Sequence, residues 1–204
     1  ANMTETNLFE ADLTGANLTG ANLSAVNLSD ANLTGVNLDR ANLDGTDLYG
    51  TNLYGASLSG TSLTTANLKD TTLAQADLSG TDLRGVDLSG MDLSGANLTK
   101  ANLNGSKLMR ANLIEANLTE ANLRGVNLSK GNLTRANLTK VNLTDAILVG
   151  AILVRSVLTD AMIKKSTLKH VFLCNTTLPD GSVSGCNLSG ANLQRVDLSW
   201  SDLT

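Results

Sequence analysis

The sequence is poor in the residue types that build most active sites, and each shortage excludes a class of site. Its 204 residues include one His, two Cys, one Pro and one Trp, and aromatic residues make up 2% of the chain. A zinc site is not expected with so few ligands, and the lone His170 indicates a surface residue rather than a general base. No apolar run approaches the roughly 18 residues of a membrane-spanning helix. We therefore expect a single soluble, non-enzymatic domain without catalytic residues, cofactor or metal.

What the sequence has instead is a repeat of five residues. Leucine stands at every fifth position from residue 8 to residue 203, replaced only by Ile163 and Val183, and Met3 precedes the series in the same register. Neither the helical period of 3.6 nor the strand period of 2.0 gives five. A fixed period of this kind predicts a solenoid, whose units bury their apolar side only by stacking on their neighbours.

Each repeat predicts one short extended side followed by a corner. With Leu as position i, position i−2 is small, i−1 is Asn or Asp at 29 of its 41 occurrences, and i+2 holds 16 of the 18 glycines. Residues i−2 and i point inward, with an outward residue between them. Position i+2 is the third place of a four-residue turn, where a type II turn requires a positive φ. Corners that carry Arg110 or Lys130 in place of Gly are expected to form looser turns.

Units such as residues 16–20 (Ala-Asn-Leu-Thr-Gly) and 96–100 (Ala-Asn-Leu-Thr-Lys) resemble the A(D/N)LXX pattern of the pentapeptide repeat family, across essentially the whole chain. The resemblance implies an all-β fold, a right-handed quadrilateral β-helix with four repeats per coil. Residues 1–204 would then form one domain of about ten coils, a rod roughly 50 Å long at a spacing of about 4.8 Å per coil.

Charge and the two cysteines depart from the uniform pattern. Residues 1–102 carry 4 Lys/Arg and 12 Asp/Glu, whereas residues 103–204 carry 11 and 7. Three arginines in the second half would stack in one corner column, either as a basic strip for an anionic partner or only as solvated charge. Cys174 is expected to face outward and Cys186 inward on another face, so no disulfide is predicted. The arginines of this strip are Arg135, Arg155 and Arg195.

One coil near the C-terminus loses the polar residue of the repeat. Ile147 and Ile152 stand at i−1, Val149 and Val154 at i+1, and Phe172 should stack one coil above Ile152. These five side chains are predicted to form an exposed apolar patch that marks an interaction surface. The alternative is a degenerate repeat whose β-branched residues only stabilise extended backbone.

The C-terminal end is expected to be an open coil. Residues 179–181 (Pro-Asp-Gly) fit a corner without a change of register, and no covering helix is visible in the sequence. An uncovered coil exposes its core and unpaired backbone edge. Trp200, with Leu198 and Leu203, is therefore predicted to form an end-to-end contact in a homodimer, unless the chain is part of a longer protein.

Two functions remain open at this point. The first is a structural scaffold or protein–protein interaction module with an unknown protein partner and no direct nucleic acid binding. The alternative, implied by the resemblance, is a DNA mimic that binds or protects a type II topoisomerase (gyrase); the acidic first half supports it and the basic second half does not. The family suggests a bacterial source, with cytoplasm, periplasm and thylakoid lumen all open.

A third possibility, an ice-binding solenoid, has less support. It rests on a stacked column of four threonines that no second threonine column accompanies and that is interrupted by Asp39, Ser59, Ser79 and Pro179. The column consists of Thr99, Thr119, Thr139 and Thr159.

Overall fold

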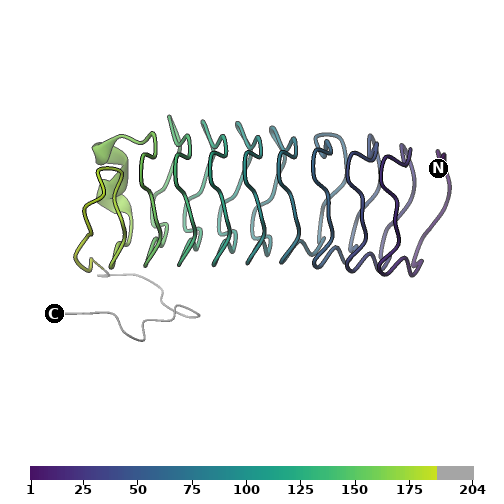
Figure 1. Ribbon diagram of the computed structural model, residues 1–204, viewed down its shortest axis with the longest axis horizontal. Helices are drawn as coiled ribbons and strands as arrows, with labels where there is room; N and C mark the ends of the chain where they lie inside the picture. Colours follow the sequence, from purple (N-terminus) through teal and green to yellow (C-terminus); the bar gives the residue numbers. More distant parts are fainter. Residues whose placement is uncertain (188–204) are drawn as a thin grey trace.

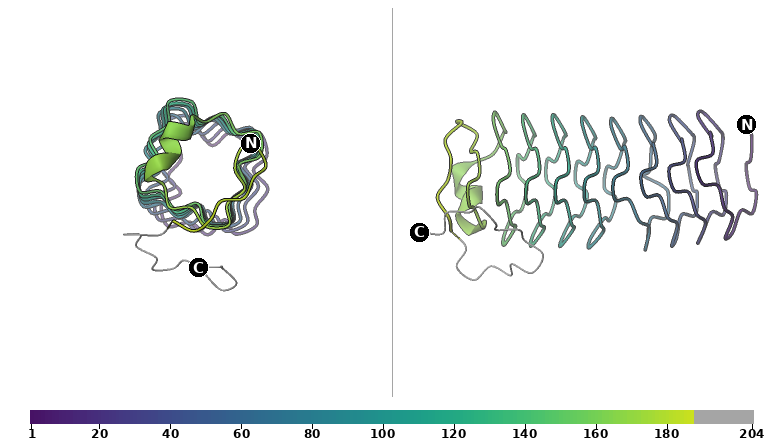
Figure 2. Two further views of the ribbon diagram at one scale, coloured as in Figure 1. Left: turned by 90° about the vertical axis from the view of Figure 1, so that its left-hand side faces the viewer. Right: turned by 60° about the horizontal axis from the view of Figure 1, so that its bottom comes forward.

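The protein is a straight rod of stacked coils, seen in a computed structural model that describes residues 1–187 (Figure 1). Parallel bridges join residues twenty apart, from Asn2 near one end to Thr177 near the other. Each coil contributes four bridge residues, and the coils superpose in one outline along the rod axis (Figure 2). Every extended side of the parallel stack is one bridge residue long, and one short helix, η1 (Lys165–His170), interrupts the stack near its C-terminal end within the described residues.

Leucine fills the interior, as the repeat predicts. Every Leu at position i from Leu18 to Leu158 is buried. Residues at i−2 are buried beside them in most coils, and where a buried one is Thr its hydroxyl donates to a backbone carbonyl. Thr46 Oγ1, for example, donates to the carbonyl of Leu23 at 2.9 Å. The core is therefore one continuous column of Leu with small side chains beside it, in which the buried Thr hydroxyls keep hydrogen-bond partners and the Ser106 hydroxyl does not.

With the exception of Thr65, the corners from Glu5 to Asp160 share a positive φ at i+2 whether or not they carry glycine. The Leu98 carbonyl accepts the amide of Ala101 at 3.0 Å, closing a four-residue turn. The i+2 residue has a φ of 67° at Gly105, 61° at Arg110 and 59° at Lys130. The expectation of looser turns at charged corners is therefore wrong. The corner amide donates to the coil above, as from Arg110 to Ser129 O at 3.0 Å, and this bond offsets the cost of left-handed backbone.

Asparagine and aspartate at i−1 brace the extended sides. Asn137 Oδ1 accepts the backbone amide of Thr139 at 3.0 Å and its hydroxyl at 2.6 Å, and the same bond to the i+1 amide recurs along the rod, as at Asn97 and Asp77. A short side-chain acceptor two residues back suits this local bond, which explains the preference for Asn and Asp at this position.

The regular stack ends before the chain does. Helix η1 replaces one bridge, so Ile147 lacks the parallel partner that Thr167 would supply in a regular coil within the described range. The chain resumes the ladder at Phe172, which pairs with Ile152 as expected, and then reverses at residues 179–181. The predicted in-register corner at Pro179 is thus wrong: the turn closes an antiparallel hairpin in which Thr177 pairs with Val183.

A disulfide joins the two strands of this hairpin. Cys174 and Cys186 are bonded, so the prediction of unpaired cysteines on different faces is wrong. That prediction extended the solenoid register beyond residue 163, whereas antiparallel pairing places the two residues opposite each other. The parallel ladder of the described chain ends at Thr177, and Trp200, Leu198, Leu203 and Arg195 lie outside the described residues.

The buried Leu column generates a first prediction. Replacing Leu98, which is fully buried, by Asp places a charge in the core with no partner, and we expect a loss of at least about 4 kcal/mol in the free energy of unfolding. Thermal unfolding followed by circular dichroism measures it. Arg110→Asp, at an exposed corner that tolerates Asp, is the matched control and should melt close to the parent. An unchanged melting temperature for Leu98→Asp would contradict the inward placement of Leu.

The hairpin generates a second prediction. Cys174→Ser combined with Cys186→Ser should destabilise the hairpin locally, by roughly 3 kcal/mol on the chain-entropy scale for a loop of this length. Hydrogen exchange should accelerate for the amides of residues 172–187 and stay slow for those of residues 90–140, whose bonds do not involve the hairpin. Loss of protection along the whole rod would show that the hairpin instead holds the entire stack together.

Candidate interaction face and cleft

Exposed apolar side chains gather on one of the four faces. This surface, called the apolar face below, carries Phe9, Tyr49, Met109 and Val149 in a single outward column and Ile147 in the column beside it. Their exposed fractions are 47%, 38%, 43%, 54% and 50%, respectively. Positions twenty residues apart stack directly. Five of the eight large apolar residues that the described chain exposes thus share one face.

The other residues of this outward column, between Phe9 and Val149, are three serines and one lysine. Ser29, Ser89 and Ser129 separate the bulky residues, and Lys69 lies over the Tyr49 ring with 5.7 Å between its Nζ and the ring centroid. Lys107 pairs with Asp87 on the same face at 3.3 Å. The apolar face is therefore a row of bulky side chains, with serines between them, that carries little net charge.

The hairpin divides the patch predicted from the sequence. Ile147 and Val149 are exposed as expected, but Ile152 is 8% exposed and Val154 fully buried. These two form a small cluster with Cys174, against which Phe172 and Cys186 pack. The prediction of five solvent-facing side chains is thus wrong for Ile152 and Val154, because the hairpin covers the side chains that a bare coil would expose.

The predicted basic strip is partly neutralised where the structure describes it. Arg135 Nη1 lies 3.1 Å from Glu115 Oε1, one coil below in the same corner column. Arg155 is half-buried. The strip therefore differs from the row of solvated cations that the sequence suggests.

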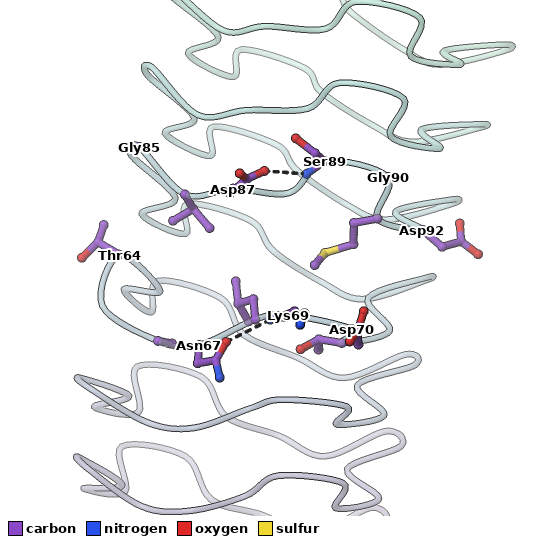
Figure 3. Close-up of a pocket in the computed structure, with 14 residues that line it drawn as sticks. Thr64, Asn67, Lys69, Asp70, Gly85, Asp87, Ser89, Gly90 and Asp92 are labelled. Carbon is purple, nitrogen blue, oxygen red and sulfur yellow. Dashed lines mark hydrogen bonds between the residues drawn. The ribbon is translucent and has the colours of Figure 1, made fainter.

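A cleft interrupts the rod in the middle of the apolar face. Residues 66–71 and 85–92 line a cavity of about 880 Å³, and Figure 3 shows the segment from Asn67 to Asp70 standing apart from the segment from Asp87 to Gly90. The bridges that would join Asn67 to Asp87 and Thr72 to Asp92 are absent from the described ladder.

Backbone groups on both edges of the cleft lack partners. In the coil below, Leu48 N donates to Asn67 O at 2.9 Å and Gly50 N to Lys69 O at 3.0 Å. The equivalent bonds across the cleft are not made within residues 1–187. The amides left without a hydrogen bond there are those of Leu68, Asp70, Leu73, Asp87 and Asp92.

Two departures from the repeat lie beside the opening. Thr65 is the one i+2 residue between Glu5 and Asp160 without a positive φ, which fits the steric cost of left-handed backbone for a β-branched residue. Its hydroxyl accepts the Gly45 amide at 3.1 Å in place of a backbone carbonyl. On the other edge Met91 occupies an i−2 position that is normally small, and it lines the cleft. A bulky inward side chain needs more room between coils.

The cleft is negatively charged. Three carboxylates, Asp70, Asp87 and Asp92, line it together with one ammonium, that of Lys69. Hydrogen bonding from Ser89, chiefly from its side chain, lowers the pKa of Asp87 below its usual value, and Lys107 adds to the effect. Asp87 therefore remains ionised at neutral pH.

Two further features bear on function. No group of three or more His, Cys, Asp or Glu residues able to hold a metal occurs in the described part of the chain. Within the same residues, no helix is long and apolar enough to cross a bilayer.

Comparisons with known proteins identify the family. The family description "Pentapeptide repeats" matches the chain in overlapping stretches from residue 1 to residue 204, so the chain belongs to the pentapeptide repeat family. A search of curated proteins by sequence finds no match.

Solved structures give the same result. HetL, a pentapeptide repeat protein involved in heterocyst differentiation regulation from the cyanobacterium Nostoc sp. strain PCC 7120, is 41% identical over 90% of this chain and 78% of HetL, with a TM-score of 0.53. Another pentapeptide repeat protein of Nostoc PCC 7120, alr5209, is 39% identical over 40% of this chain and 68% of its own, with a TM-score of 0.40. QnrB1, a plasmid-mediated fluoroquinolone resistance protein, is 20% identical over 85% and 84% of the two chains at a TM-score of 0.40, too distant to indicate a role here.

The open cleft generates a third prediction. The five unpartnered amides should exchange with solvent at least tenfold faster than those of Leu48, Gly50 and Leu53 in the coil below, because exchange is slowed by hydrogen bonding. Thr65→Gly with Met91→Ala should restore slow exchange, since glycine permits the positive φ and alanine the normal spacing. Residue-resolved hydrogen exchange by NMR measures both. Equal protection in the two coils of the parent protein would mean that the cleft is closed in solution.

Proposed function

We propose that this protein is a non-enzymatic structural scaffold and protein–protein interaction module whose partner protein docks on the apolar face. The observation that carries the proposal is the stacked column of Phe9, Tyr49, Met109 and Val149, which holds four of the eight large apolar side chains that the described residues expose. Large apolar side chains gathered on one surface commonly mark a contact site, and Phe, Tyr and Met are enriched at protein interfaces. Family members are generally non-enzymatic structural or interaction proteins.

The geometry of the face specifies the partner's chemistry. Phe9 and Tyr49 are two coils apart, as are Met109 and Val149, which corresponds to about 10 Å at the usual strand spacing. A matching partner would present a near-neutral surface with apolar side chains at similar intervals, which fit over the intervening serines. Each of these two pairs of side chains stands on coils joined by unbroken bridges, on either side of the cleft, so binding there orders little additional backbone.

The gyrase-binding alternative receives less support. A DNA mimic needs a continuous anionic surface, and pairing interrupts the acidic columns in mid-rod. Asp82 pairs with Arg84 at 2.7 Å and Asp87 with Lys107 at 3.3 Å. The apolar face, in contrast, carries few charges, so a protein partner can dock there without having to pair many charged side chains.

A fourth prediction tests the proposed face. Met109→Ser with Val149→Ser should weaken binding to the native partner at least tenfold while changing the free energy of unfolding by no more than about 0.5 kcal/mol, because both side chains are exposed. A photoreactive residue at position 109, introduced in the producing organism, identifies the partner by cross-linking. Titration calorimetry with the purified partner then measures affinity.

Tyr54→Ser is the matched control, since Tyr54 is equally exposed but stands on the neighbouring face. It should leave affinity within about twofold of the parent. Equal losses for the two variants, or no loss for Met109→Ser with Val149→Ser, would overturn the assignment of the face. Inhibition of gyrase supercoiling that survives the double substitution would favour the DNA-mimic alternative.

A further inference from the structure

We propose that the cleft between residues 67–72 and 87–92 binds an extended, basic segment of a partner protein, which enters between the coils as an additional strand. The proposal deepens the proposed function, because it assigns to the interaction module a second and chemically different contact. It rests on three observations: unpartnered backbone on both edges, apolar side chains in the cleft, and an excess of carboxylates along it.

Main-chain pairing is the first part of the argument. The lower edge offers the amides of Leu68, Asp70 and Leu73, and the upper edge those of Asp87 and Asp92, none of which is bonded within the described chain. Exposed strand edges recruit further strands by main-chain hydrogen bonds. A single extended segment between the two edges would satisfy both and continue the ladder of parallel bridges that stops at Asn67 and Thr72.

The size of the cleft suits such a segment. Adjacent strands lie about 4.8 Å apart, so an inserted strand needs about twice that distance between its neighbours. The cavity of about 880 Å³ is within the range of roughly 300–1,000 Å³ typical of ligand sites. Figure 3 shows that the opening continues from Asn67 to Asp70 along one edge. A short extended peptide has the shape to pair with two facing strand edges, whereas a helix about 10 Å across does not.

Side-chain chemistry sets the sequence of the segment. Ala66, Val86 and Met91 are half-buried and line the cleft, where they would contact apolar side chains of the segment. The carboxylates of Asp70 and Asp92 are exposed beside it. Because strand side chains alternate, the segment should alternate apolar residues facing the core with basic residues facing the carboxylates.

The same charges disfavour other ligands. The three carboxylates of the cleft face two ammonium groups, that of Lys69 and that of Lys107, which pairs with Asp87 at 3.3 Å. The remaining negative charge of Asp70 and Asp92 disfavours phosphates, so nucleic acid is not expected to bind. A metal ion is not favoured either, since the described residues contain no suitable group of ligands.

The experiment uses the full protein and three acetylated, fluorescein-labelled hexapeptides. The first is Lys-Val-Lys-Val-Lys-Thr, the second replaces each Lys by Glu, and the third is the basic peptide with alternate backbone amides N-methylated. Fluorescence anisotropy at fixed ionic strength measures affinity. We expect saturable binding of the basic peptide at one site per chain and at least tenfold weaker binding of the other two, because N-methylation blocks edge pairing.

Variants locate the site. Asp70→Asn with Asp92→Asn should weaken the basic peptide at least fivefold. The matched control is Glu10→Gln with Asp12→Asn, which makes equivalent changes in the same two columns near the N-terminal end and should leave affinity unchanged. Closing the cleft with Thr65→Gly and Met91→Ala should abolish binding, and in the parent protein the peptide should slow exchange of the Leu68 and Asp87 amides.

Several outcomes would overturn the proposal. Equal binding of the basic and N-methylated peptides, or equal weakening by the control variant, would show surface ion pairing alone. An absence of saturable binding, or unchanged exchange of the Leu68 and Asp87 amides on adding the peptide, would also contradict binding in the cleft. Self-association that disappears in the closed-cleft variant would mean that a second copy occupies the cleft. Partner binding that still depends on Met109 and Val149 would leave the proposed function standing in each case, because those side chains lie outside the cleft.

Discussion

The stacking of one coil on the next is the constraint on which this structure depends. Each coil donates its amides to the coil above, as Leu98 N does to Asn117 O at 2.7 Å, so the coils must lie one strand spacing apart. That spacing limits the inward i−2 residue to a small side chain and requires a left-handed backbone at the corner. It also lines up outward side chains of successive coils in columns, so a residue acquires neighbours twenty positions away rather than nearby in sequence.

The repeat alone predicts the inward Leu, the four-residue corners and the family. It fails where residues leave the register. Cys174 and Cys186 are equidistant from Asp180, as are Thr177 and Val183, which is the symmetry of a hairpin around a Pro-Asp-Gly turn. That signal was present in the sequence, but extending the five-residue period through it concealed the pairing. The prediction that Ile152 and Val154 are exposed is wrong for the same reason, since the hairpin buries them.

The cleft was harder to foresee, because it needs two departures that are minor by themselves. A polar residue such as Thr65 is not unusual at a corner. What sets it apart is its β-branched side chain, which disfavours the positive φ found at the other corners. The side chain of Met91 is larger than those at the neighbouring inward positions. Only the structure shows that the two residues stand on adjacent coils beside the open part of the ladder. The apolar column was accessible in principle, since Phe9, Tyr49, Met109 and Val149 differ by multiples of twenty, although the local cluster of Ile and Val near residue 150 was the more visible feature.

The departures from the repeat are where the structure differs from a uniform rod, and the largest of them is the open cleft on the apolar face. The separation between Leu68 N and Asp87 O in a crystal structure of the protein tests it most directly. Our account predicts a separation of more than about 5 Å, beyond any hydrogen bond, against the 2.9 Å of the equivalent pair, Leu48 N and Asn67 O, one coil below. A separation close to 2.9 Å across the cleft would contradict it.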